Sequence, residues 1–413
     1  MQILVIHQGF PGQFIHLLPR LNSKGYKITA ISKPWKGAAP LPSWLNFHSY
    51  VLRRGNSLSI HEFCSEMESK TLRAEAVALK ALELKKEGYQ PDLILGHPGW
   101  GEMLFLSEIW PKAPQLHYVE FFHGVPGTDD DFDGGLKLER TWVDGARAKI
   151  KNAHNLSCLN QMTQGITPTK FQHSLLPKWA QERTTIVHDG IDTNWLKPNS
   201  KASLEIPAHD SMPKNLKIKH GDPLITFINR TFEPYRGIHI FMRALTHIQK
   251  QHPQLQTILI GQDTANVSYG KKRNDGKGWL TTLRNELGTS LDWSRIHQMG
   301  LVSHSSLLKI FQISSAHIYL SYPFVLSWSL LEAMSCGCLV IGSDTPPVKE
   351  VIKDGINGYL VPFNDEKAIS NTVTKALEQN SGNIRISARA HIQTHYELQD
   401  CLEKQIALIE NFA

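Results

Sequence analysis

Residues 316–341 contain the feature that most restricts the fold of this chain: two short apolar runs separated by a polar loop and a helical pattern. The runs are 316–320 (AHIYL) and 338–341 (CLVI), and both have the length and composition of buried parallel strands. Between them Leu330, Leu331 and Met334 recur at helical spacing, and Gly337 is expected to end the helix. The stretch therefore predicts a strand, a loop, a helix and a second strand of a parallel α/β sheet.

The start of that helix has the chemistry of a ligand site. Backbone N–H groups of Leu326, Ser327 and Trp328 would point toward an anion held in the loop. Glu332 lies a little more than one turn inside the helix, where its carboxylate can accept hydrogen bonds from the paired hydroxyls of a sugar. An anion site beside a hydroxyl acceptor favours a nucleotide, bound through its ribose and its diphosphate.

The length and composition restrict the class of protein. A chain of 413 residues is long enough for two domains with full cores. No run approaches the roughly 20 consecutive apolar residues of a membrane-spanning helix. The five cysteines are scattered and odd in number, and the first residues form a strand pattern rather than a secretory signal. We therefore expect a cytoplasmic protein.

Charge and ligand spacing exclude two kinds of partner. The net charge of +6 is mild and no stripe gathers it, so we expect no nucleic-acid partner, although anionic substrates or an anionic bilayer surface fit it. Cys336 and Cys338 lack further ligands at zinc-binding spacing. Strand alternation places His117 and His123 on the face opposite Glu120. We therefore expect no metal site.

A glycine-containing loop follows the first strand pattern, residues 3–6. It contains Gly9 and Gly12 but lacks the G-x-G-x-x-G spacing of a dinucleotide site. The two glycines would either let the backbone approach a ligand closely or only make a tight turn.

Two candidate catalytic residues lie at strand patterns in the first half of the chain. His97 stands between glycines just after the strand pattern 92–95, which is the crevice position of an open α/β sheet. It is either a catalytic or a structural histidine. Glu120, within the strand pattern 116–121, is a second and weaker catalytic candidate.

Two arginines follow the first strand pattern of the second half, residues 223–228. Arg230 and Arg236 stand between this strand and the next helix, where two guanidinium groups suit a diphosphate. The alternative is a pair of surface arginines without a ligand.

These patterns give a domain plan. We expect a first Rossmann-like domain over 1–197, a linker over 198–222 that is rich in Pro, Ser and Lys, a second Rossmann-like domain over 223–385 and C-terminal helices over 386–413. Within the first domain we expect a helix over 57–86, a helix over 142–152 and a strand over 156–159.

Several of these motifs resemble those of one enzyme family. Residues 332–337 (EAMSCG) resemble the C-terminal donor signature of the family 4 glycosyltransferases, which have an acidic residue, seven further residues and then this Glu. The first acidic position is Phe324 here, so half of the acidic pair is missing. Residues 9–14 and 96–102 resemble a bacterial branch of the family that builds surface polysaccharides.

The resemblance implies a fold and an activity. It implies the α/β GT-B fold, in which two Rossmann-like domains face a central cleft and a C-terminal helix returns to the N-terminal domain. It also implies transfer of a sugar from a UDP- or GDP-linked donor, with retention and without a metal, to a hydroxyl of a saccharide or lipid-linked saccharide. The enzyme would then touch the inner face of the membrane only peripherally.

The resemblance also suggests roles for single residues. His97 would lie beside the donor sugar, and the backbone near Val302 would meet the nucleotide base. Two alternatives stay open: a nucleotide-sugar epimerase with the same two-domain layout, and a non-catalytic protein that binds sugar nucleotides. The missing acidic residue at position 324 is the reason for the second alternative.

Overall fold

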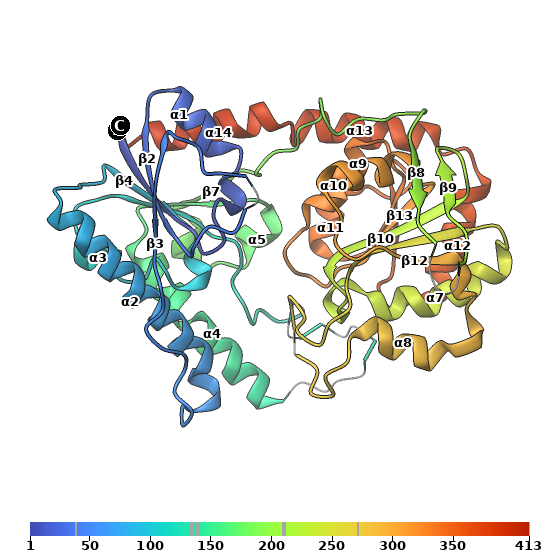
Figure 1. Cartoon of the computed structure of the whole chain (residues 1–413), viewed down its shortest axis with the longest axis horizontal. Coiled ribbons are helices and arrows are strands. Elements are labelled where there is room, and N and C mark those ends of the chain that lie inside the picture. The colour runs from blue at the N-terminus through green and yellow to red at the C-terminus, as the bar shows by residue number, and fades with distance from the viewer. Residues whose placement is uncertain are drawn as a thin grey trace. The chain divides into compact units, whose positions relative to one another are not determined.

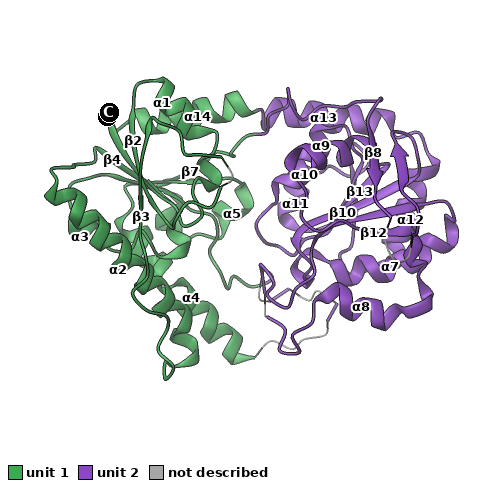
Figure 2. Cartoon of the chain, viewed as in Figure 1, with its two compact units in different colours: residues 1–126, 140–190, 398–413 green, residues 127–139, 191–397 purple. Residues whose placement is uncertain are grey.

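Two parallel β-sheets organise the chain, one in each of the two units that Figure 2 shows in different colours. The structure is a computed structural model that describes residues 1–37, 39–129, 131–132, 135–136, 141–208, 212–270 and 272–412. Unit 1 comprises residues 1–126, 140–190 and 398–413, and unit 2 comprises residues 127–139 and 191–397.

The sheet of unit 1 has seven strands in the order β3-β2-β1-β4-β5-β6-β7, and every pair is parallel. The strands are β1 (Gln2–Ile6), β2 (Lys27–Ser32), β3 (Leu45–Ser49), β4 (Leu93–Gly96), β5 (Gln115–Tyr118), β6 (Gln164–Thr167) and β7 (Thr184–Ile186). The α-helices are α1 (Leu17–Ser23), α2 (Ser65–Lys86), α3 (Leu106–Ile109), α4 (Trp142–Gln161), α5 (Lys170–Ser174), α6 (Lys178–Gln181) and α14 (Leu398–Glu410). Short 3-10 turns are η1 (Gly12–Phe14), η2 (Glu62–Cys64) and η3 (Pro98–Trp100).

Both faces of this sheet are covered, which explains why its central strands β1 and β4 are almost entirely apolar. In β1, Ile3 and Val5 pack with residues of α1 and α14, whereas Leu4 and Ile6 pack with residues of α2 and α3. Figure 1 shows the strands of the sheet and the labelled helices on either side of it.

The sheet of unit 2 has six parallel strands in the order β12-β11-β10-β13-β14-β15. They are β10 (Leu224–Thr231), β11 (Gln256–Gln262), β12 (Ile296–Gln298), β13 (Ala316–Tyr319), β14 (Val340–Ser343) and β15 (Tyr359–Val361). The α-helices are α7 (Ile238–Gln251), α8 (Trp279–Leu287), α9 (His304–Ile313), α10 (Trp328–Ser335), α11 (Pro346–Val351), α12 (Glu366–Glu378) and α13 (Gly382–His395), and the 3-10 turns are η4 (Pro234–Arg236), η5 (Gly288–Ser290) and η6 (Trp293–Arg295). The predicted unit around α10 is present as β13, α10 and β14, and Gly337 follows α10 with a left-handed φ of 71°.

Two predicted elements of the first half are wrong in extent or type. The helix expected over 57–86 begins only at Ser65, because residues 57–61 form turns and η2 precedes α2. The strand expected over 156–159 is the end of α4. A short apolar run does not distinguish the two states, but Ala148, Asn152, Asn155 and Leu159 are buried at intervals of four, three and four residues, which is the period of a helix.

The units divide the chain at positions other than the predicted ones. The long segment of unit 2 begins at Ile191, whereas the first domain was predicted to extend to residue 197. The expected linker 198–222 contains an antiparallel hairpin of β8 (Ser203–Ile206) and β9 (Leu216–Lys219), whose Ile206 and Ile218 belong to the core of unit 2. At the other end, α13 belongs to unit 2 and α14 to unit 1, where its apolar side chains pack beside β1 and α1. No helix in the described part of the chain is long and apolar enough to cross a membrane.

Candidate active site

The strand order of each sheet reverses direction at one point, between β1 and β4 in unit 1 and between β10 and β13 in unit 2. In open α/β sheets, ligands bind beyond the carboxyl ends of the strands at such a point. Most of the candidate residues from the sequence follow these four strands or their neighbour β5.

In unit 1, four side chains from three loops form one polar cluster. His97, after β4, has its Nε2 atom 3.3 Å from Oε2 of Glu120, after β5. Nε2 of Gln13 donates a hydrogen bond to the other oxygen of Glu120 at 3.0 Å. Oε1 of Gln13 lies 2.8 Å from Nε2 of His7, which follows β1. The sequence predicted His97 and Glu120 as candidates, and the structure adds His7 and Gln13.

Backbone contacts settle which histidine nitrogens carry the hydrogens. Nδ1 of His97 accepts a hydrogen bond from the Gly99 amide at 3.1 Å, so the neutral ring carries its hydrogen on Nε2, toward Glu120. Nδ1 of His7 accepts in the same way from Gly9, so Nε2 of His7 donates to Gln13. Burial and, to a smaller extent, the nearby His97 together lower the pKa of His7 to about 4. His7 is therefore neutral at pH 7.

Glu120 is the anionic member of the cluster. Burial alone would raise the pKa of this carboxyl group, but the contacts with His97, His7 and Gln13 outweigh burial and lower the pKa. The side chain retains 26% exposure, so Glu120 is not fully enclosed. A fixed carboxylate beside an imidazole N–H can orient that imidazole and stabilise positive charge that develops nearby.

The two predicted glycines of the first loop differ in what they permit. Gly12 has a left-handed φ of 53°, and a Cβ atom there would lie 2.2 Å from Cε1 of His7. Gly9 has open space around it and contributes only its backbone amide. Close packing of the His7 ring therefore requires glycine at position 12 but not at position 9.

Aromatic rings hold His97 from both sides. Its ring is stacked against Trp100 and against Tyr118, with centroid distances of 5.8 Å in both cases and interplanar angles of 24° and 26°. The hydroxyl of Tyr118 donates a hydrogen bond to Asp189 at 3.0 Å. His97 is 2% exposed, so its position is set by this packing.

In unit 2, the two predicted arginines have different environments. Arg236 is buried, and its Nη1 atom donates to Oγ of Ser321 at 2.8 Å and to the hydroxyl of Tyr319 at 3.3 Å. Its guanidinium group also lies over the rings of Tyr269 and Phe324, at 5.3 and 5.8 Å from their centroids. At position 324 this chain thus has a ring that packs on a cation, where the family motif has a carboxylate.

Arg230, near the end of β10, is exposed, and its side chain forms no hydrogen bond or ion pair with another described residue. One of the two arginines is therefore fixed by the fold and the other is available to a ligand.

The loop before α10 is joined to Arg236 through one hydroxyl. The amide of Ser327 donates a hydrogen bond to the hydroxyl of Tyr319 at 2.8 Å, and this oxygen is the one that also accepts from Arg236. The Ser327 amide is therefore already bonded, and an anion would have to replace Tyr319 there. Leu326 is buried, and Trp328, the first residue of α10, is partly exposed.

Glu332, in α10, has a partner that the sequence did not reveal. Nε2 of His304, the first residue of α9, lies 2.8 Å from Oε1 of Glu332. This hydrogen bond raises the pKa of His304, although partial burial acts in the opposite direction. The ring of Trp195 packs on His304 at a centroid distance of 4.5 Å. Val302, two residues before His304, is partly exposed.

In the part of the chain that the structure describes, no three His, Cys, Asp or Glu side chains are arranged to hold a metal ion. The five cysteines are all free thiols, and burial raises the pKa of Cys338 to about 11.

The fold defines the class of protein. Solved structures that are similar over the whole chain include a sucrose-phosphate synthase from Thermosynechococcus elongatus, with a TM-score of 0.70, 18% identity and coverage of 100% of this chain and 98% of that one. They also include HepE from Anabaena in complex with UDP and glucose, with a TM-score of 0.67, 14% identity and full coverage of both chains. The two Rossmann-like sheets thus have the GT-B architecture of glycosyltransferases.

Family models then identify the family. Residues 25–196 match the model described as "Glycosyl transferase family 4 group", and residues 209–393 match "Glycosyl transferases group 1". The chain therefore belongs to the family 4 glycosyltransferases. Among its relatives, spore coat protein SA of Bacillus subtilis (strain 168) is 22% identical over 335 residues, which are 79% of this chain and 80% of that protein.

Proposed function

We propose that this glycosyltransferase moves a hexose from a UDP- or GDP-linked donor to a hydroxyl group of a saccharide or lipid-linked saccharide, with retention of configuration. The observation that carries the proposal is the environment of Arg236 at the switch point of unit 2. This buried guanidinium is held by hydroxyl groups and aromatic rings, without an ion pair to a described carboxylate. A fixed cation of this kind suits the diphosphate of a sugar nucleotide.

The proposed mechanism divides the work between the groups of unit 2. Arg236 and Arg230 stabilise the negative charge that grows on the leaving diphosphate, so no metal ion is needed. Glu332, oriented by His304, accepts hydrogen bonds from the ribose hydroxyls. The backbone around Val302 meets the base. The complex of the similar Anabaena protein with UDP and glucose favours a uridine nucleotide among the donors.

The cluster of unit 1 acts on the transferred sugar in this proposal. His97 lies beside the transferred sugar with its Nε2 hydrogen directed to Glu120, and Glu120 keeps the ring oriented and stabilises positive charge near the anomeric carbon. No second carboxylate of the described residues joins Glu120 in the cluster as a covalent glycosidase mechanism would need. Retention would then arise without a glycosyl-enzyme, with the leaving phosphate taking the proton of the acceptor.

The donor assignment is tested by screening UDP- and GDP-sugars with thermal unfolding, since a ligand of the folded state raises the melting temperature. In Arg230→Ala we expect a smaller shift with the best donor and a turnover that falls about tenfold or more, as for a lost charge-assisted hydrogen bond. Arg20→Ala, an exposed arginine of α1, is the matched control. Unchanged binding and turnover in Arg230→Ala would refute the donor assignment.

Two other activities are separated by the products. Release of an isomerised sugar nucleotide without any acceptor would identify an epimerase. Binding of a sugar nucleotide without turnover, across a pool of saccharide and lipid-linked acceptors, would identify a non-catalytic binding protein. The proposed transfer requires a new glycosidic bond that depends on the acceptor.

A surface of unit 1 supports peripheral contact with the cytoplasmic face of a membrane, as a lipid-linked acceptor would require. Leu58, before α2, is fully exposed and Trp142, at the start of α4, is 77% exposed. Phe63 packs on Trp142 at 6.1 Å, and Arg147, which is ion-paired with Glu62 at 2.7 Å, lies over the Phe63 ring at 5.7 Å. Apolar tips beside a cation are typical of interfacial binding.

The membrane proposal is tested by sedimentation with vesicles of anionic or neutral lipid. Trp142→Ser should weaken binding to anionic vesicles several-fold, whereas Trp179→Ser, an exposed tryptophan elsewhere in unit 1, should not. Equal binding of both variants and the parent would argue against this surface.

A further inference from the structure

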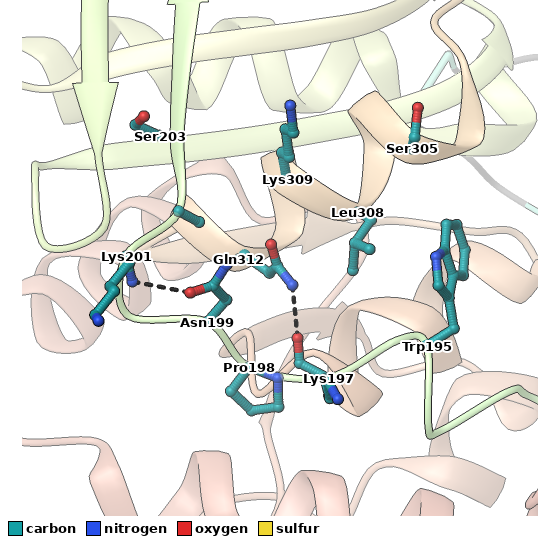
Figure 3. Close-up of a pocket in the computed structure, with 11 residues that line it drawn as sticks. Trp195, Lys197, Pro198, Asn199, Lys201, Ser203, Ser305, Leu308, Lys309 and Gln312 are labelled. Atoms are coloured by element: carbon teal, nitrogen blue, oxygen red, sulfur yellow. Dashed lines mark hydrogen bonds between the residues drawn. The ribbon is translucent and has the colours of Figure 1, made fainter.

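Unit 2 has a pocket outside the candidate active site, of about 650 Å³. It lies between the first half of the predicted linker and the outer side of α9 (Figure 3). Its lining residues are Trp195, Lys197, Pro198, Asn199, Lys201, Ala202, Ser203, Ser305, Leu308, Lys309 and Gln312. The volume lies within the range of about 300–1,000 Å³ that is typical of small-molecule sites.

The charge of this pocket is positive and uncompensated. Lys197, Lys201 and Lys309 line it, and no lining residue is acidic. None of the three ammonium groups forms an ion pair or a hydrogen bond with another described residue. Three like charges around one pocket attract an anion, because each lowers the potential energy of negative charge there.

The three lysines do not converge on one point. Figure 3 shows their side chains pointing in different directions around the rim of the pocket. Such an arrangement does not enclose a single small anion such as phosphate. It can meet the charge of a larger ligand whose remaining surface fills the pocket.

The interior offers groups for an uncharged, hydroxyl-bearing body. Gln312 is 8% exposed, and its Nε2 atom donates to the carbonyl oxygen of Lys197 at 2.7 Å. Figure 3 shows the amide oxygen of Gln312 directed away from Lys197, so it can accept a hydrogen bond from a hydroxyl. The indole of Trp195, which also lines the pocket, provides a flat apolar surface that suits the C–H face of a pyranose.

We infer that this pocket binds an anionic saccharide, that is, a sugar or short glycan that carries phosphate or carboxylate groups. The indole and the amide hold the sugar ring, and the rim lysines hold its charges. This inference does not depend on which donor the enzyme uses, because no pocket residue is assigned to the donor, although Trp195 packs on His304, which orients Glu332.

The inference is tested by calorimetric titration of the full chain with three probes: glucose 6-phosphate, a hyaluronan tetrasaccharide and uncharged maltotetraose. The two anionic probes distinguish phosphate from carboxylate as the preferred charge. We expect at least one of them to bind, and maltotetraose to bind at least tenfold more weakly. Inorganic phosphate, as a fourth probe, should not compete with the anionic saccharide at equal concentration.

The variant Lys201→Gln/Lys309→Gln places the binding in this pocket. It should weaken the anionic saccharide about tenfold or more and leave UDP binding unchanged, because the donor residues lie elsewhere. Lys250→Gln, an exposed lysine of α7, is the control and should change neither. The inference is overturned if the double variant binds the anionic probe as tightly as the parent, if maltotetraose binds equally well, or if neither anionic probe binds.

A failed inference and a failed donor assignment give different results. If the donor assignment fails, UDP- and GDP-sugars do not bind the parent protein, whereas the titration with anionic saccharides is unaffected. If the pocket fails, donor binding and its loss in Arg230→Ala remain as proposed.

Discussion

At the scale of single residues, Gly12 combines a left-handed backbone with a ring packed directly against its Cα. The absence of a side chain at this position is what lets His7 reach Gln13, and through Gln13 the carboxylate of Glu120. A methyl group would have to displace the His7 ring. The polar cluster of unit 1 therefore depends on a residue that has no side chain of its own.

We predict that Gly12→Ala lowers both stability and turnover. The strained φ and the displaced ring should cost about 1–3 kcal/mol of unfolding free energy, and turnover should fall at least tenfold because Glu120 loses its alignment. Gly9→Ala is the control, since a Cβ atom there meets nothing within 4 Å, and it should stay within about 0.5 kcal/mol of the parent. Urea unfolding and an activity assay measure the two effects. Equal effects of both substitutions would contradict the steric account.

The contact between His304 and Glu332 should be visible in the titration of His304. Its hydrogen bond to Glu332 raises its pKa, so the pair contributes stability that is fully present below the ordinary histidine pKa of about 6.5 and is lost as the pH rises through the raised value. In an NMR titration, the His304 signal should therefore change at a higher pH than an exposed histidine. Glu332→Gln should move it back toward the ordinary range. A His304 titration that is the same in both proteins would show that the contact does not form in solution.

At the scale of elements, helix α2 holds the loop that carries His97. Lys70 is 7% exposed, with its Nζ atom 3.1 Å from Nδ1 of His154, and Nε2 of His154 lies 3.2 Å from the carbonyl oxygen of Gly99. One turn later, Nε of Arg73 donates to the carbonyl oxygen of Trp100 at 2.6 Å. Burial lowers the pKa of Lys70 to about 8, and this group still donates to His154. Arg73 thus fixes the carbonyl group of Trp100 directly, and Lys70 fixes that of Gly99 through His154.

We predict that Lys70→Met loosens this loop. The turnover number should fall about tenfold while the KM for the donor changes less than twofold, because the donor contacts assigned to unit 2 are untouched. The pH dependence of turnover should also shift, since the environment of His97 changes. Lys86→Met, in the exposed last turn of α2, should have no effect on either quantity. If Lys70→Met retains the parent's turnover number and pH profile, α2 does not position His97.

Helices and strands were predicted correctly where the spacing of apolar residues agreed with the residues that begin or end an element. The unit β13–α10–β14 was read correctly because Leu330, Leu331 and Met334 follow the helical period and Gly337 can adopt a left-handed conformation. Residues 156–159 were misread because four residues are too few to separate a strand from the end of a longer helix.

Residues of the candidate site could be predicted from the sequence only where their position next to a strand identified them. His97 could be found because it directly follows a strand. The sequence could not reveal the roles of Gln13 and His304, because each contacts a residue 28 or more positions away along the chain. It could not reveal the role of Tyr319 either, because this hydroxyl joins η4 to the loop before α10. A tyrosine at the end of an apolar strand is read from sequence as a core residue.

At the scale of the whole molecule, buried neutral histidines make the stability of the fold depend on pH. Burial lowers the pKa of six histidines in the described chain to about 3 or 4: His7, His117, His154, His188, His317 and His391. In the unfolded chain each would titrate near 6.5, so the unfolded state binds more protons between pH 6.5 and about 4. The stability that these groups provide is present above pH 6.5 and is lost as the pH falls, by up to about 1.4 kcal/mol per pH unit for each group.

The six histidines are unevenly divided, and this leads to a prediction that distinguishes the two units. The first four belong to unit 1, and only His317 and His391 belong to unit 2. We therefore predict that unit 1 loses stability faster than unit 2 when the pH falls from 7 to 5. Hydrogen exchange, corrected for the intrinsic pH dependence of the exchange rate, should show protection lost earlier in β1 and β5 than in β10 and β13.

The acid sensitivity of unit 2 can be tested separately with a histidine variant. His391→Gln removes one proton-binding group from unit 2 at a half-buried position, so it should flatten the pH dependence of unit 2 and leave that of unit 1 unchanged. Equal acid sensitivity of the two sheets, or greater sensitivity in β10 and β13, would mean that groups other than the buried histidines control acid unfolding. Each buried histidine adds to the slope of the unfolding free energy with pH. The difference in this slope between the two units therefore reports the burial of their histidines, and no activity assay is needed.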